Sequence, residues 1–158
     1  MQEPGEHPYC GDGIIPKTGF SYTPESLMHN RVEYYNMFWK DLSTPSHETT
    51  VKIVQLMHKT IIEGGPERRN KVLVHCHAGQ GRTAIIIGAY LLYGGISNTA
   101  EEAVALSKKG RPKLFKNPYN AKYLVHFEEY LKEIRQLYPL KAHDMTLKHI
   151  LKKQRIIL

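Results

Sequence analysis

Two short segments of the sequence have the residue pattern of β-strands. Residues 71–75 (KVLVH) are almost all apolar, which is typical of a strand buried within a parallel sheet. Residues 32–38 (VEYYNMF) begin with a β-branched residue and contain three aromatic ones, which also favours a strand. The first 30 residues are rich in glycine and proline, so they predict turns, with room for one short hairpin.

Four further segments have the pattern of helices. Val54, Met57 and Ile61 recur at helical spacing, after a start signal in which Thr44 is the cap and Pro45 lies in the first turn. The other helices are expected from Arg82 to Gly94, from Asn98 or Thr99 to Gly110, and from Asn117-Pro118 to Tyr138. Helices that alternate with apolar strands predict an α/β fold with its chemistry at the carboxyl end of a strand.

The composition is that of an ordinary globular domain. The chain has 158 residues, of which 41% are hydrophobic and 23% charged, which excludes a disordered or collagen-like chain. The longest apolar stretch, 84–93, is about half as long as a membrane-spanning helix. Two cysteines, Cys10 and Cys76, allow at most one disulfide, which favours a reducing, cytoplasmic compartment and a free thiol.

Positive charge is concentrated in the second half of the chain. Residues 1–79 contain eight basic and nine acidic residues, whereas residues 80–158 contain fourteen basic and six acidic ones. Such a balance indicates an anionic partner, but charge alone does not choose between a phosphorylated substrate, nucleic acid and an acidic membrane. Five of the charges lie in one loop: Lys108, Lys109, Arg111, Lys113 and Lys116. A solvated loop is the default interpretation, and steering of a phosphorylated substrate is the alternative.

The turn that begins at Cys76 has the residues needed for nucleophilic phosphoryl transfer. The thiolate of Cys76 would be the nucleophile, because the N-terminus of the following helix and the loop N–H groups stabilise it over the thiol. The backbone of the loop can surround one phosphate through His77, Ala78, Gly79, Gln80, Gly81 and Arg82. Arg82 offers paired hydrogen bonds to phosphoryl oxygens, and Thr83 can donate its hydroxyl to the sulfur.

A structural interpretation of the same turn is that Cys76 is a buried small side chain in a tight turn. This would be favoured for a lone cysteine. The seven specified letters of H-C-x-A-G-x-G-R-T occur by chance on the order of once per billion positions, which favours the functional interpretation.

The Cys-x5-Arg pattern resembles the cysteine-based protein tyrosine phosphatases in their dual-specificity form. The resemblance extends to one subgroup of this family through further residues, namely Gly5-Glu6-His7, Cys10-Gly11, Gly19-Phe20, Tyr22, Pro24, Tyr35-Asn36, Trp39-Lys40-Asp41, Lys141-Ala142-His143, Thr146-Leu147 and Gln154-Arg155. It implies the cysteine-phosphatase fold, with a short, mostly parallel central sheet flanked by helices. It also implies hydrolysis of phosphotyrosine through a phosphocysteine intermediate, with phosphoserine and phosphothreonine left open, and with no cofactor or metal.

The resemblance assigns roles to residues outside the loop. Asp41 is expected to be the general acid, because it follows an aromatic segment and lies 35 residues before Cys76, as the acid of this family does. A solvated loop residue or a helix cap is its alternative role, and Asp12 and Glu48 are weaker candidates for the acid. His75 is expected to support the loop by hydrogen-bonding its carbonyls, and His77 to reach the substrate or the solvent.

Two positions depart from the pattern of the family. Ala84 replaces the usual glycine at the start of the helix. Asn120 stands where related phosphatases often have a glutamine that positions the hydrolytic water.

The resemblance also predicts how the chain is divided. Residues 1–139 are expected to form the catalytic domain, N-terminally incomplete and lacking N-terminal strands of the family, and residues 140–158 a basic amphipathic helical extension. The expected partner is a phosphorylated protein, with no nucleic acid, no membrane association and a monomeric state. A phosphoinositide phosphatase and a catalytically weak phosphate-binding or scaffold module are the alternatives.

Overall fold

Helices account for the regular structure of the described chain. The computed structural model describes residues 1–9, 13–63 and 70–137, and the chain divides into two compact units, Met1–Glu128 and Glu129–Leu158. In chain order the helices are α1 (Pro24–His29), α2 (His47–Glu63), α3 (Arg82–Tyr93), α4 (Ala100–Gly110) and α5 (Pro118–Leu137). The predicted extension 140–158, Cys10, Asp12 and the predicted helix stop at Gly64 to Pro66 lie outside the described residues.

Two of the predicted helices, α3 and α4, have the bounds that their local signals indicate. α4 follows Thr99, whose side chain accepts a hydrogen bond from the Glu102 backbone N–H at 3.2 Å. The Glu102 carboxylate in turn accepts from the Asn98 N–H at 2.8 Å, so it satisfies the backbone donor of the residue before the cap. α3 starts at Arg82 and ends directly before Gly94, as predicted.

Two details of the helix prediction were wrong. α2 begins at His47 rather than near Thr44, because the Ser46 hydroxyl accepts from the Thr49 N–H at 3.1 Å and thereby caps the helix. α1 was not predicted, because none of its six residues is buried and it has no apolar stripe to reveal it.

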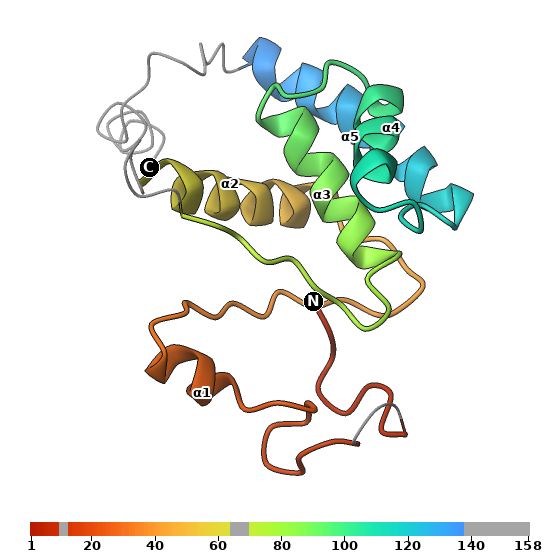
Figure 1. Ribbon diagram of the computed structural model, residues 1–158. Helices are drawn as coiled ribbons and strands as arrows, with labels where there is room; N and C mark the ends of the chain where they lie inside the picture. Colours follow the sequence, from red (N-terminus) through yellow and green to blue (C-terminus); the bar gives the residue numbers. More distant parts are fainter. Residues whose placement is uncertain (10–12, 64–69, 138–158) are drawn as a thin grey trace. The chain divides into compact units, whose positions relative to one another are not determined.

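The core of the first unit lies around α3, which contacts both α2 and α4 (Figure 1). The largest fully buried side chains there are Thr50, Val54, Thr83, Ile85, Ile86, Leu124 and Phe127. Gly88 lets the first half of α5 approach α3, because a Cβ at this position would collide with the side chains of Leu124 and Phe115. α3 begins at Arg82, directly where the predicted phosphate loop ends.

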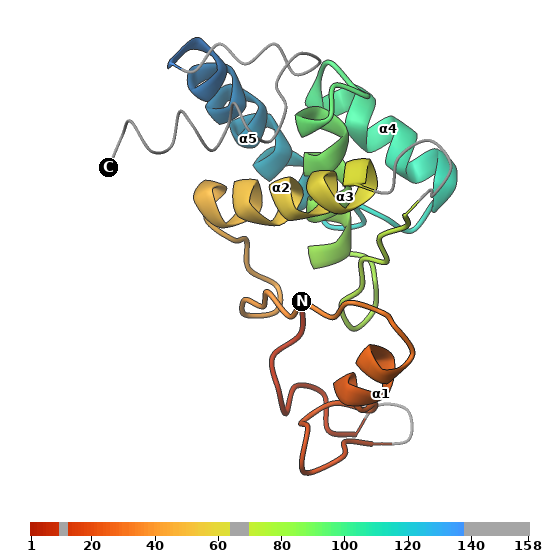
Figure 2. The same cartoon turned by 90° about the vertical axis from the view of Figure 1, so that its left-hand side faces the viewer.

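The predicted mostly parallel sheet is not confirmed. Within the described residues the only β pairing is an isolated antiparallel bridge between Ile15 and Phe20, and Figure 2 draws neither 32–38 nor 71–75 as a strand. A groove of about 660 Å³ lies between these two segments, and residues of both line it. Strands are stabilised by backbone hydrogen bonds to a neighbour about 4.8 Å away, and no such pairing joins these two segments in the structure.

None of the described helices combines the length and the apolar character that crossing a bilayer requires.

Candidate active site

Cys76 lies at the point where the 71–75 segment turns toward α3. Its side chain is buried, and the Thr83 hydroxyl donates a hydrogen bond to its sulfur at 3.1 Å. Burial by itself raises the pKa of a thiol. Hydrogen bonds from the side chain and backbone of Thr83 and from the Gly79 N–H, together with the charge of Arg82, outweigh it, so the pKa of Cys76 is lowered.

The two loop glycines have different functions. Gly79 has a φ of +66°, in the left-handed region that favours glycine, and a Cβ there would lie 2.8 Å from the Arg111 guanidinium, which would have to shift. Gly81 has a φ of −100°, outside the left-handed region. It is the N-cap residue of α3, and its carbonyl accepts from the Ile85 N–H at 3.1 Å.

Two other loop residues accept hydrogen bonds, through their backbone carbonyls, from the segment between α4 and α5. Arg111 donates to the Ala78 carbonyl at 3.3 Å, and the Phe115 N–H donates to the Gln80 carbonyl at 3.3 Å. Part of the basic loop thus supports the phosphate loop, which places positive charge beside the site.

Arg82 is almost completely buried, with 2% of its side chain exposed. Its two terminal nitrogens donate to the Glu6 carboxylate, at 2.8 Å for Nη1 to Oε2 and 2.5 Å for Nη2 to Oε1. Nη1 also donates to the Trp39 carbonyl at 3.1 Å, and Nη2 lies 3.2 Å from Asp41 Oδ1. The hydrogen bonds from Arg82 lower the pKa of Glu6 to about 2, so Glu6 is a carboxylate throughout the physiological range.

Asp41, the expected general acid, lies beside the loop and near Arg82. Its side chain is 39% exposed, and its second oxygen, Oδ2, lies 3.4 Å from His7 Nε2. His7 also approaches Glu6, with 2.9 Å between Nε2 and Oε1. Arg82 and Asp41 are thus part of one charged cluster that also contains Glu6 and His7.

The two histidines that flank Cys76 point to different partners. The His75 Nε2 lies 3.3 Å from the hydroxyl of Tyr22, and the ring also has a backbone hydrogen bond to Cys76. Burial, and after it the charge of the chain's N-terminal ammonium, lowers the pKa of His75, which favours the neutral ring. His77 is exposed, and its ring stacks on His7 with centroids 4.1 Å apart.

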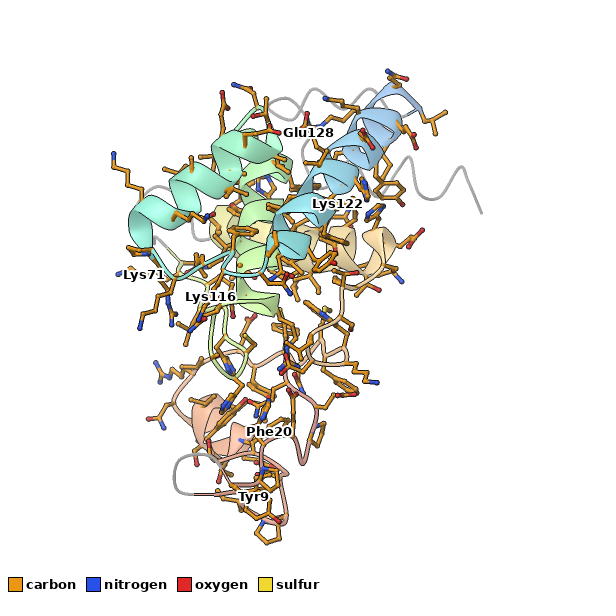
Figure 3. All side chains as sticks on the ribbon, turned by 90° about the vertical axis from the view of Figure 1, so that its right-hand side faces the viewer. Tyr9, Phe20, Lys71, Lys116, Lys122 and Glu128 are labelled. Atoms are coloured by element: carbon orange, nitrogen blue, oxygen red, sulfur yellow. The ribbon has the colours of Figure 1, made fainter. Side chains whose placement is uncertain are left out.

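A cavity of about 390 Å³ opens over Cys76 and Arg82. Its wall includes His77, Ala78, Gln80 and Gly81 of the loop, Asp41, Leu42 and Ser43 of the predicted acid loop, and Lys116, Asn117 and Asn120. Figure 3 shows Lys116 beside the N-terminal end of α3, and Asn120 is buried in the first turn of α5. The cavity can therefore receive an anionic group between a thiol, a guanidinium and a carboxylic acid.

Residues 18–130 match the family model of the dual specificity phosphatase catalytic domain. The chain belongs to this family. It is 33% identical over its full length to protein tyrosine phosphatase domain-containing protein 1 of Danio rerio and 34% identical to that of Mus musculus, and it covers 22% and 21% of those proteins. The crystal structure of Tk-PTP in the G95A mutant form is similar with a TM-score of 0.63 and 25% identity, over 75% of both chains. The chain thus spans about a fifth of the length of these curated relatives, and its fold is the cysteine-phosphatase fold.

Sequence reasoning missed two members of the charged cluster. Glu6 and His7 contributed to the family resemblance, but no site role was predicted for either of them. A signal was available for Glu6, because a buried arginine in a phosphate loop requires a carboxylate partner. No comparable signal marked His7, whose neighbours Asp41 and His77 are 34 and 70 residues away in the sequence.

Proposed function

We propose that this chain is a catalytic domain that hydrolyses phosphate monoesters of proteins, phosphotyrosine above all, through a phosphocysteine intermediate. The Cys76 thiolate forms a bond to phosphorus while the bond from phosphorus to the ester oxygen breaks. Asp41 gives its proton to the departing oxygen, and Arg82 with the loop N–H groups binds the non-bridging oxygens. Water then attacks phosphorus, Asp41 takes a proton from it, and the thiolate leaves.

The observation that carries the proposal is the pairing of an acidified thiol with an available arginine donor. The pKa of Cys76 is lowered, although burial alone would raise it. Arg82 Nε is buried and has no hydrogen-bond partner among the described residues. A buried donor without a partner is costly, and an anionic oxygen of the substrate would satisfy it.

Thr83 and Asn120 are proposed to act in the second step. The Thr83 hydroxyl, at 3.1 Å from the sulfur, would stabilise the thiolate as it leaves phosphorus. Asn120 lines the cavity and supplies an amide where related phosphatases often have a glutamine. We propose that it orients the attacking water.

The substrate class rests on the family and on the charge around the cavity. A lipid substrate is the second candidate, because an Arabidopsis thaliana relative named as both a phosphatidylinositol 3,4,5-trisphosphate 3-phosphatase and a protein-tyrosine-phosphatase is 34% identical over 54% of this chain. His77 and Gln80 favour a phosphoprotein, since lipid-specific relatives tend to have lysines inside the loop. The monomeric state and the reducing compartment stay predictions.

We further propose that 32–38 and 71–75 belong to the central sheet of the fold. Both segments line one groove, which Ile53 and Met57 of α2 also line. An extended segment lying in this groove could form strand hydrogen bonds with both 32–38 and 71–75. Slow amide hydrogen exchange at Val72 and Val74 would support this, and exchange at the rate of an unstructured peptide would contradict it.

The test of the function compares the wild type with Cys76→Ser on p-nitrophenyl phosphate, a phosphotyrosine peptide and a phosphoinositide. We expect the wild type to release phosphate from the first two and the variant from none, while the variant still binds the phosphopeptide. Retained turnover in Cys76→Ser would contradict the proposal, and faster release from the lipid would reassign the substrate. If the wild type binds the phosphopeptide but releases no phosphate from any substrate, the chain is a phosphate-binding module rather than an enzyme.

A further inference from the structure

His7 has an unusual backbone conformation for its residue type. Its φ is +58°, in the left-handed region that non-glycine residues seldom adopt. The conformation directs the ring into the charged cluster, where it stacks on His77 at an interplanar angle of 23°. Strain of this kind persists where the surrounding structure fixes it, and it is concentrated at functional sites.

The ring nitrogen of His7 is placed between two carboxylates. Nε2 lies 2.9 Å from Glu6 Oε1 and 3.4 Å from Asp41 Oδ2. This nitrogen is buried, yet in the described part of the chain no hydrogen bond is aligned on it. His7 therefore has a buried ring nitrogen at short range from two carboxylates, those of Glu6 and Asp41, with no hydrogen bond aligned to either among the described residues.

The second contact of Asp41 is to Arg82, the group that must bind the phosphoryl oxygens. Arg82 Nη2 lies 3.2 Å from Asp41 Oδ1. When Arg82 binds a phosphate dianion, its attraction for the aspartate is shared with the substrate. The Asp41 side chain is 39% exposed, so packing alone does not hold it, and within the described ranges of the chain its other ion-pair contact is to His7.

We propose that His7 is a positioning residue for the general acid: it donates its Nε2–H to the Asp41 carboxylate and directs the other oxygen toward the leaving group. This proposal rests on the proposed function, in which Asp41 protonates the departing oxygen. As Asp41 loses its proton it becomes a carboxylate, and a hydrogen bond from His7 stabilises that charge. The stack on His77 holds the plane of the His7 ring, so that Nε2 stays directed at the two carboxylates.

A metal ion is the alternative interpretation of the same cluster. Ligand atoms of Glu6, His7 and Asp41 lie within 4.8 Å of one another, which is close enough for one ion. The Arg82 guanidinium already contacts both carboxylates. It provides the positive charge that an ion would bring, so we assign the cluster to proton transfer.

The experiment measures kcat on two substrates that differ in their need for an acid. The p-nitrophenolate leaving group hardly needs a proton, whereas the phenolate of phenyl phosphate does. Four variants are compared with the wild type: His7→Asn, His7→Gln, Asp41→Asn and the control His126→Asn. Asparagine is well suited to a positive φ, and glutamine can place an amide donor near the position of Nε2. His126 is exposed on α5 and far from the loop in sequence.

We expect His7→Asn to lower kcat on phenyl phosphate about tenfold, which is the size of the effect of losing one hydrogen bond to a charged group. On p-nitrophenyl phosphate the same variant should lower kcat less than about twofold. His7→Gln should recover most of the loss, and His7→Asn should have little further effect in the Asp41→Asn background. The control variant should match the wild type on both substrates.

Several results would overturn the proposal. Equal losses on the two substrates in His7→Asn, no recovery by His7→Gln, or additive losses in the double variant would each remove the positioning role while leaving the proposed function intact. If Asp41→Asn lowers kcat by the same factor on both substrates, Asp41 is not the general acid, and the proposed role of His7 is then also wrong. Loss of wild-type turnover on adding a chelator would assign the cluster to a metal.

Discussion

Replacing Glu6 with glutamine keeps the shape of the side chain and removes the negative charge beside the buried Arg82. The Glu6 side chain is 10% exposed and that of Arg82 is 2% exposed, so little solvent is available to replace the lost partner. Hydrogen bonds from Arg82 hold the pKa of Glu6 at about 2, against an ordinary value of 4.5. We therefore expect Glu6→Gln to lower the free energy of unfolding at neutral pH.

The size of the effect follows from the shift in pKa. A shift of one unit corresponds to about 1.4 kcal/mol, which gives an upper limit of roughly 3 kcal/mol for Glu6. Solvent in the cavity screens the pair and Asp41 remains beside Arg82, so we expect a loss of about 1–3 kcal/mol. Because the pKa is lowered on folding, this stabilisation is fully present above pH 4.5 and is lost as the pH falls through about 2.

The assay is urea unfolding of the wild type and Glu6→Gln, followed by the fluorescence of Trp39, the single tryptophan. Glu63→Gln is the matched control, because it removes an exposed pair with Lys59 at 3.7 Å and should cost less than about 0.5 kcal/mol. The difference between the wild type and Glu6→Gln should shrink between pH 4.5 and the lowest pH at which the protein still folds. A difference no larger than that of the control, or one that is independent of pH, would refute the reasoning.

Three further predictions concern the loop, the acid and the core. Thr83→Val should raise the pKa of Cys76 and slow its alkylation by iodoacetamide at pH 6 about tenfold, since one hydrogen bond to the sulfur is lost; an unchanged rate would contradict this. Asp41→Asn should lower kcat on phenyl phosphate about 10²–10⁴-fold and much less on p-nitrophenyl phosphate, and stopped-flow or steady-state assays on both substrates check it. Gly88→Ala should lower the free energy of unfolding by about 1–3 kcal/mol, because the new Cβ collides with buried side chains. Gly110→Ala is the control, because a Cβ there meets nothing within 4 Å, and it should be neutral or slightly stabilising. Denaturant titrations of both variants check this.

The helices were predictable because their signals are local. The capping pair of Thr99 and Glu102 lies within four residues, and α3 is bounded by its own sequence from Arg82 to Gly94. The start of α2 was misplaced because two hydroxyl residues near Pro45 compete for the cap and only the structure shows which one is aligned. The strands could not be predicted with the same success, since pairing depends on a neighbour that the 71–75 pattern does not specify.

The candidate site was predictable where its residues follow one another in the sequence. Cys76, Arg82 and Thr83 lie within one turn, and their spacing alone indicates the chemistry. Glu6 contacts Arg82, which is 76 residues away in the sequence, and His7 contacts Asp41, which is 34 residues away. A periodic pattern describes only local structure, so it could not predict either contact. The loop glycines show the same limit, because only Gly79 has a positive φ and the sequence does not distinguish it from Gly81.

The most direct test of covalent catalysis is to trap the intermediate on Cys76. The wild type is mixed with p-nitrophenyl phosphate, quenched in acid within milliseconds and digested, and the peptide that contains Cys76 is weighed by mass spectrometry. We expect a burst of p-nitrophenol of about one equivalent per active site. The peptide should carry the added mass of one phosphoryl group, and neither signal should appear with Cys76→Ser. Steady turnover by the wild type without a phosphorylated cysteine, or the same burst from Cys76→Ser, would contradict the account.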